Sequence, residues 1–200
     1  MAVVSIVDGL DCFAEDFKGI TLHGSKIKRA EFEACTFVSC DFSETFFLSC
    51  RFIECRFENC NLSLVKLTGT KMSDVTFVSC KMVGIDWTMC DYKSLLSAEP
   101  LRFVESILND SNFYGLELED LVMKECRAKE VDFREASLKR ADFSGTDFKG
   151  ALFENTNLEY ANFRDAQNTY IDIRRNHLKK ATFDRYEALF LLEIMEITLV

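Results

Sequence analysis

The sequence predicts an all-β solenoid with four flat sides, because large apolar residues recur at every fifth position. The register runs from Phe17 to Tyr92 and, after a shift of one residue, from Phe103 to Phe183; 32 of its 33 positions are apolar, and the exception is Asn168. A helix repeats near 3.6 residues and a flat strand near 2, so neither keeps a strict period of five. Four sides of five residues make one square coil of about 20 residues, which does keep it.

A second column, two residues before each large one, holds small or β-branched side chains without charge. Eight of the nine cysteines fall in it, and Cys12 is the exception. The three remaining columns hold nearly all of the Asp, Glu, Lys and Arg residues. We therefore expect a filled core in which large and small side chains alternate inside a charged surface. Roughly eight coils stacked at a strand spacing of about 4.8 Å would give a rod about 40 Å long.

The register slips once, in a segment that holds the only proline, Pro100. We interpret this segment as a short loop that breaks the rod into two stacks within one continuous domain. The expected boundaries are an N-terminal stack at about 12–92, a loop at 93–102, a C-terminal stack at about 103–185, and a helix and tail at 186–200, all in a single solenoid domain of residues 1–200.

The last residues leave the five-residue register and predict a short helix from about Tyr186 to Met195 with a wide apolar face. The segment is too short and too charged to span a membrane. We expect the helix to cap the last coil and, because it has surplus apolar surface, to join two copies of the chain as a homodimer. The residues expected at the dimer interface are Leu189, Phe190, Leu192, Ile194 and Met195.

The cysteines have two interpretations. Cys50, Cys55 and Cys60 are evenly spaced and could form a metal ladder, or they could be small buried apolar groups. A spacing of five places them on different sides of the coil, unlike the paired cysteines of zinc sites. We favour the core role and expect no metal and no cofactor. Nine thiols without a signal peptide indicate a reducing, cytoplasmic location.

The sequence contains no catalytic constellation. The two histidines, His23 and His177, are expected on outward columns far apart along the rod, and no nucleophile elbow, phosphate-binding loop or zinc-protease motif occurs. A filled solenoid also offers no polar pocket for a substrate. We therefore expect that the protein is not an enzyme. Asn168 is expected to point inward and to bond neighbouring backbone through its amide.

The net charge of −9 argues against nucleic-acid binding, which calls for basic patches. The acidic excess lies along the shaft: residues 31–92 have nine acids and five bases, and residues 111–165 have twelve acids and eight bases. It could serve ordinary solubility, or the rod could imitate duplex DNA for a protein with a basic groove. The outward acidic residues expected to make that contact are Asp74, Asp86, Asp91, Glu117, Glu119, Asp120, Asp132, Asp142 and Asp147.

The pentapeptides at 141–145 (ADFSG) and 161–165 (ANFRD) resemble the pentapeptide-repeat family, and the resemblance covers about residues 15–185. It implies a right-handed quadrilateral β-helix. Because that fold hosts several unrelated roles, it does not by itself decide the function.

Two stretches, 106–127 and 170–176, are similar to the topoisomerase-protecting branch of the family, and to the albicidin-resistance protein AlbG in particular. The branch also includes the Qnr quinolone-resistance proteins and the microcin B17 immunity protein McbG. The ending at 187–192 resembles the dimer helix of that branch. The resemblance implies a head-to-head, rod-shaped dimer that binds DNA gyrase, and often topoisomerase IV, as a DNA mimic. Such a protein protects the enzyme from a poison such as a quinolone or an albicidin-like toxin.

One departure concerns the loops. Qnr proteins of Gram-negative bacteria have two projecting loops, whereas here only the segment 93–102 could project, which favours a peptide-like toxin at least as much as a quinolone. The loop residues expected to contact gyrase are Leu95, Leu96, Glu99 and Leu101, although the same leucines could pack onto the rod as a hinge. The alternative function is an interaction scaffold without a topoisomerase partner. A continuous negative stripe across the dimer axis would favour mimicry, and an evenly mixed surface would favour the scaffold.

Overall fold

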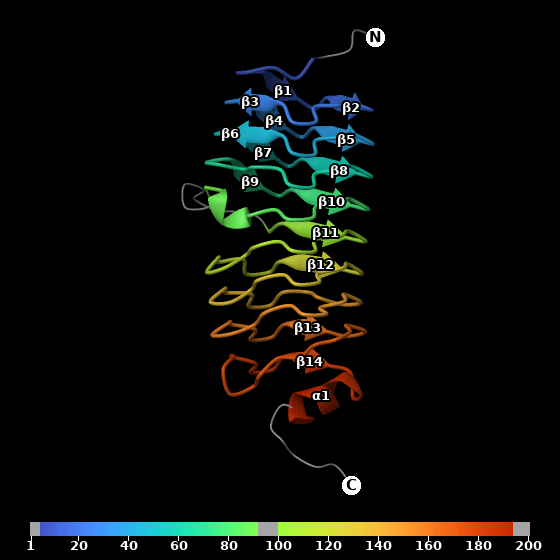
Figure 1. Ribbon diagram of the computed structural model, residues 1–200, viewed down its shortest axis with the longest axis vertical. Coiled ribbons are helices and arrows are strands. Elements are labelled where there is room, and N and C mark those ends of the chain that lie inside the picture. Colours follow the sequence, from blue (N-terminus) through green and yellow to red (C-terminus); the bar gives the residue numbers. More distant parts are fainter. Residues whose placement is uncertain (1–4, 92–99, 194–200) are drawn as a thin grey trace.

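The computed structural model describes residues 5–91 and 100–193, which form a parallel β-solenoid. The chain winds in flat coils that stack along one axis, and helix α1 lies at the C-terminal end of the stack (Figure 1). Neighbouring strands of a sheet are mostly 20 residues apart, as Phe17 is from Phe37 and Phe37 from Phe57. The predicted all-β solenoid with a short C-terminal helix is confirmed.

The rod has four sides, which we name faces A to D in chain order. In the third coil these faces are centred on Phe52 (A), Phe57 (B), Leu62 (C) and Leu67 (D). Face A holds β1 (Asp11–Phe13), β4 (Glu31–Glu33), β7 (Arg51–Ile53) and β9 (Lys71–Ser73). Face B holds β2 (Asp16–Lys18), β5 (Thr36–Val38), β8 (Arg56–Glu58), β10 (Thr76–Val78), β11 (Arg102–Val104), β12 (Val122–Lys124), β13 (Asn162–Phe163) and β14 (Thr182–Phe183). Face D holds β3 (Lys26–Lys28), β6 (Phe46–Leu48) and the 3-10 helix η1 (Trp87–Met89). Face C is joined by single bridges such as Thr21 with Asp41.

The large inward column forms ladders of aromatic rings. Phe37 is 1% exposed and lies between the stacked rings of Phe17 and Phe57, at centroid distances of 4.9 and 4.6 Å. Rings on adjacent faces meet edge to face, as those of Phe32 and Phe37 do at 5.4 Å. Both arrangements are favoured by the ring quadrupole, so the phenylalanines support one another along and across the rod.

The small inward column bonds the backbone of the neighbouring coil, which explains why Thr, Ser and Cys are frequent in it. Thr45 Oγ1 donates to the Leu22 carbonyl at 2.7 Å, and the Cys55 thiol donates to the Phe32 carbonyl at 3.3 Å. All nine cysteines are buried, including Cys12, which occupies the large column of face A. Burial raises the pKa of the Cys55 thiol to about 12, so this group stays neutral and unreactive.

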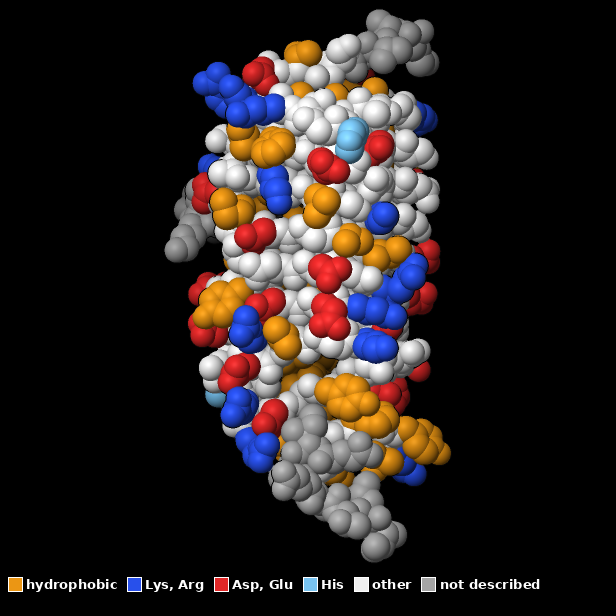
Figure 2. Space-filling model, viewed as in Figure 1, with side chains coloured by type: hydrophobic (Ala, Val, Ile, Leu, Met, Phe, Trp, Pro, Cys, Tyr) orange, Lys and Arg blue, Asp and Glu red, His pale blue; other side chains and the backbone are white. Residues whose placement is uncertain are grey.

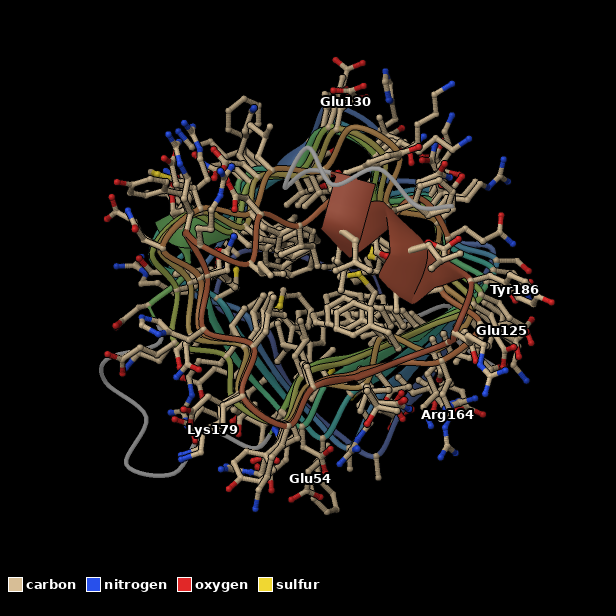
Figure 3. The ribbon with its side chains drawn as sticks, turned by 90° about the horizontal axis from the view of Figure 1, so that it is seen from below. Glu54, Glu125, Glu130, Arg164, Lys179 and Tyr186 are labelled. Atoms are coloured by element: carbon tan, nitrogen blue, oxygen red, sulfur yellow. The ribbon has the colours of Figure 1, made fainter. Side chains whose placement is uncertain are left out.

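Most sides of the coil end at a corner residue with positive φ, two places after the large inward residue. Many corners are not glycine: Glu54, Glu125 and Glu130 have φ of 52°, 51° and 55°. Figure 3 shows these three side chains at three different corners, pointing away from the core. The left-handed region costs a residue with a Cβ roughly 1–2 kcal/mol, which the packed core must offset at every turn.

The register slip is a six-residue insertion in one coil. Phe77 pairs with Phe57 at an offset of 20 residues but with Phe103 at an offset of 26. The insertion lies on face A between Asp91 and Pro100, and residues 92–99 are outside the described part. The face-B sheet runs through β10, β11 and β12 without a gap, so the stacking of coils continues past the insertion.

The last coil departs from the predicted register. Asn168 is half-buried and has a φ of 57°, and its Nδ2 donates to Asp147 Oδ1 at 2.6 Å. Thr169 and Ile171 are fully buried, whereas Ile173 is 36% exposed. The predictions of a backbone-bonded Asn168 and an inward Ile173 are therefore wrong, because the amide reaches a carboxylate of the neighbouring coil and the chain turns early.

Helix α1 (Glu187–Glu193) begins one residue later than predicted and covers the end of the rod. Leu191 packs against the core, and the Phe190 ring lies 5.4 Å from that of Tyr170. The helix thus caps the last coil through part of its apolar face.

Candidate functional site

The nine predicted acidic residues do not form one stripe, because the structure spreads them over all four faces. Asp142 lies on face B, Asp147 on face C, and Asp86 and Asp132 on face D. Asp74 holds the corner between faces A and B. The other four lie together on face A and define the candidate site.

Asp91, Glu117, Glu119 and Asp120 line one groove of about 840 Å³, which we name the face-A groove. The groove lies beside the two described ends of the insertion, since Asp91 and Pro100 both line it. It follows from two features of the sequence: the coil that carries the insertion, and the acidic run at 117–120 one coil further on.

An arginine partly neutralises the groove. Arg140 Nε donates to Asp120 at 2.8 Å, and its Nη2 donates to Asp120 and Glu119, each at 2.8 Å. These hydrogen bonds lower the pKa of Asp120, which is therefore ionised at neutral pH. Asp91 lies 3.8 Å from Lys71 Nζ. Among the described residues, Glu117 makes no ion pair, so it is the most available carboxylate of the groove.

Most of the other carboxylates are also paired. Ion pairs within 4 Å join Asp74 to Arg102, Asp132 to Arg134, Asp142 to Lys124 and Asp147 to Lys129. Asp86 has no basic partner in the described chain and instead accepts hydrogen bonds from Thr88 and Asn112. Seven of the nine predicted carboxylates thus lie beside a lysine or arginine, and Figure 2 shows acidic and basic side chains interspersed on the face viewed. Of the nine, four cluster in the face-A groove, and the other five are spread elsewhere on the rod.

Sequence reasoning missed a polar cluster on face C. His23 Nδ1 lies 2.9 Å from Ser43 Oγ, and that hydroxyl donates to Asp41 Oδ1 at 2.6 Å. A nucleophilic serine donates its hydroxyl proton to the histidine, whereas the Ser43 hydroxyl donates to the Asp41 carboxylate. This hydrogen bond lowers the pKa of Asp41. The arrangement therefore joins two coils and does not activate the hydroxyl. The spacing of 20 residues between His23 and Ser43 was the signal that could have found it.

The predicted loop contacts fall mostly outside the described residues: Leu95, Leu96 and Glu99 all do. Leu101 is described, and it does not project. It is 2% exposed in the small column two places before Phe103, so a partner cannot reach its side chain.

The predicted dimer residues lie on α1 or beyond it. Leu189 is 39% exposed, Phe190 and Leu192 are half-buried, and Ile194 and Met195 are outside the described residues. Tyr170, Tyr186 and Ile173 add exposed apolar surface at the same end, at 55%, 80% and 36%. Figure 2 shows hydrophobic side chains gathered near the C-terminal end of the rod.

Two further classes of site were sought in the described chain. Residues 5–91 and 100–193 contain no cluster of three or more His, Cys, Asp or Glu side chains placed to hold a metal ion. Nor do these residues form a helix with the length and apolarity that a bilayer crossing requires.

A filled four-sided solenoid with one residue pointing inward at the centre of each pentapeptide defines a class of repeat proteins. The chain belongs to the pentapeptide-repeat family, since the family model described as a pentapeptide repeat region matches residues 30–99 and 97–163. A search of curated proteins gave no match.

Among the solved structures that match, one superposes closely enough to show the same fold. A trypsin-treated M102R form of QnrB1, described as a plasmid-mediated fluoroquinolone resistance protein, superposes with a TM-score of 0.52 at 20% identity, covering 97% of this chain and 99% of that one. Full-length QnrB1 gives 0.45 at 22% identity, covering 94% and 100%. HetL, described as involved in heterocyst differentiation regulation in the cyanobacterium Nostoc sp. strain PCC 7120, gives 0.38 at 15% identity, covering 87% of both chains.

Proposed function

We propose that this chain is a non-catalytic, cytoplasmic protein that binds DNA gyrase, and topoisomerase IV as a second target, and protects the enzyme from a topoisomerase poison. The observation that carries the proposal is the clustering of Asp91, Glu117, Glu119 and Asp120 in one groove beside the insertion. Carboxylates in a groove present a focused negative field to a basic DNA-binding surface. The whole-length similarity in fold to a fluoroquinolone resistance protein supports the same partner.

The ion pairs limit where DNA mimicry can act. Of the nine predicted carboxylates, those of faces B, C and D are mostly paired with lysine or arginine, and Asp86 on face D is the exception. On face A, by contrast, the unpaired Glu117 shares one groove with three other carboxylates. We therefore place the gyrase contact on face A and not along the entire shaft. The exposed apolar surface of Leu189 and its neighbours joins two copies into a homodimer, which sedimentation of the purified protein would show as twice the 23.0 kDa chain mass.

A scaffold without a topoisomerase partner is the second candidate. The mixed charge of the shaft favours it, because paired surface charges serve solubility and need no basic partner.

A supercoiling assay with purified gyrase separates the two. In the presence of a quinolone or albicidin, the protein is expected to restore supercoiling, and the drug that is countered identifies the poison class. The double variant Asp91→Asn/Glu117→Gln is expected to require at least about tenfold more protein for the same rescue, because the groove loses two charges.

The matched control is Asp132→Asn/Asp142→Asn, which removes the same charge from faces D and B and should leave rescue unchanged. Equal loss in both variants would move the contact from the groove to the shaft. Neither rescue nor inhibition at any ratio of protein to gyrase would leave the scaffold as the better account.

A further inference from the structure

Face D has an opening in its ladder of hydrogen bonds, between the coil of Leu67 and the coil of Trp87. Bridges join Phe46 to Lys66 and Asp86 to Asn112, but none joins Lys66 to Asp86. The cause is η1: the Asp86 carboxylate accepts hydrogen bonds from Thr88 N at 3.1 Å and Thr88 Oγ1 at 2.6 Å, which turns the chain into a 3-10 helix where other coils are extended.

The opening is bounded at both ends by intact bonds between the two coils. Leu64 N donates to the Val83 carbonyl at 2.8 Å on one side, and Gly69 N donates to the Met89 carbonyl at 2.9 Å on the other. The gap is therefore too short for a strand and has room only for a small group.

Four backbone groups at this opening lack the partners that they have in other coils. Elsewhere on face D the central N–H donates to the next coil, as Phe47 N does to the Lys66 carbonyl at 2.9 Å. Leu67 N–H and Asp86 N–H have no acceptor within the described part of the chain, and the carbonyls of Val65 and Asp86 receive no donor there. Buried backbone groups are normally paired, so these four mark a site where a partner is missing.

The same residues line a cavity of about 320 Å³. Besides the backbone groups just named, Lys66 and Thr68 line it, and its apolar walls are Phe46 and Met89, which are 42% and 46% exposed. This volume lies at the lower end of the range for small-molecule sites.

We propose that this opening binds a small neutral aromatic carboxamide. The carboxamide oxygen accepts from the N–H groups of Leu67 and Asp86, its NH₂ donates to the Val65 carbonyl, and its ring packs between Phe46 and Met89. Lys66 and Asp86 both line the cavity, so the charged groups of its lining balance and favour a neutral ligand. A carboxylate ion has no hydrogen to donate to the Val65 carbonyl, and an ammonium ion offers no acceptor for the two N–H groups. The proposal does not depend on the proposed gyrase contact, which lies on face A.

The test is a titration of the ¹⁵N-labelled full chain with benzamide. Saturable shifts of the Leu67 and Asp86 amide signals are expected, with a Kd on the order of 1–10 mM for so small a ligand. The fluorescence of Trp87, the single tryptophan, should change over the same concentrations because this residue begins η1. Benzoate and benzylamine should each bind at least about tenfold more weakly.

Variants locate the binding. Phe46→Ser and, separately, Met89→Ser should each weaken benzamide binding at least about tenfold while the circular dichroism spectrum is kept. Phe13→Ser removes an exposed phenylalanine from face A and should leave binding unchanged. The proposal is overturned if benzamide gives no saturable shift, if benzoate binds equally well, or if both wall variants bind like the unaltered chain.

Discussion

Phe37→Ala is expected to lower the free energy of unfolding by about 3–5 kcal/mol, the largest effect of any single truncation in this chain. Phe37 is 1% exposed and touches five other rings: it stacks on Phe17 and Phe57 and meets three more edge to face. A coil cannot close around the vacated space, because its backbone is held by the coils on both sides. The measurement is urea unfolding followed by circular dichroism.

The matched control is Phe13→Ala, which removes a ring that is 68% exposed and should change stability by less than about 0.5 kcal/mol. Because a solenoid is stabilised mainly by contacts between neighbouring coils, the loss in Phe37→Ala should begin in the N-terminal coils. Trp87 fluorescence should therefore change later in the transition than the circular dichroism. Equal midpoints for the two variants would show that the ring ladder does not hold the rod together.

Cys55→Asp is expected to destabilise the protein by at least about 4 kcal/mol at pH 7, whereas Cys55→Ser should cost about 1 kcal/mol. The Cys55 thiol is 1% exposed and donates to the carbonyls of Phe32 and Ile53, each at 3.3 Å. A serine hydroxyl can keep these bonds. An ionised aspartate cannot donate, and it would face two carbonyl oxygens in a site that excludes water.

The loss in Cys55→Asp should depend on pH with a defined sign. Desolvation raises the pKa of the introduced carboxyl in the folded chain above its unfolded value of about 3.9. The folded state then holds the proton more tightly, so the penalty is smallest below about pH 4 and grows as the pH rises toward the folded pKa. Urea unfolding of the Asp and Ser variants between pH 4.5 and 8 measures this difference. A difference that does not change with pH would mean that the carboxylate escapes to solvent.

The inward residues were predictable because a strict period of five indicates a four-sided coil, and the limited space inside it requires one large and one small uncharged side chain on each side. The corner residues could not be predicted, because closure of the coil imposes positive φ on Ser, Glu, Asp and Ala alike. No single residue type therefore marks a corner in the sequence. The break at η1 was hidden because Trp87 keeps the apolar register while Asp86 and Thr88 turn the backbone. The register of the last coil was predicted wrongly for a similar reason. The hydrogen bond from Asn168 to Asp147 joins residues 21 apart in the sequence, which no local pattern indicates.

The acidic site was only partly predictable. The nine carboxylates were correctly placed outward, but their charge could not be judged from one coil, because the neutralising residue is often a full coil away. Arg140 and Asp120 are 20 residues apart, and so are Lys71 and Asp91. Reading each charge against the residues 20 positions before and after it would have found the partners of Asp91 and Asp120, but not that of Asp132, which lies only two residues away.

Because its coils are uniform between the groove and the last coil, the rod acts as a spacer that fixes two quantities: the distance between two sites along the axis, and the face on which each site lies. Glu117, Ser137, Asn157 and His177 follow one another on face A, so the groove and the last coil are separated by three whole periods. Deleting 20 residues between them would shorten that separation by about 4.8 Å and keep both on face A. Deleting ten would instead place them on opposite faces. The binding of a partner that contacts both the groove and the C-terminal end therefore depends on the number of whole coils between them. A change in that number would alter binding without altering any contacting residue.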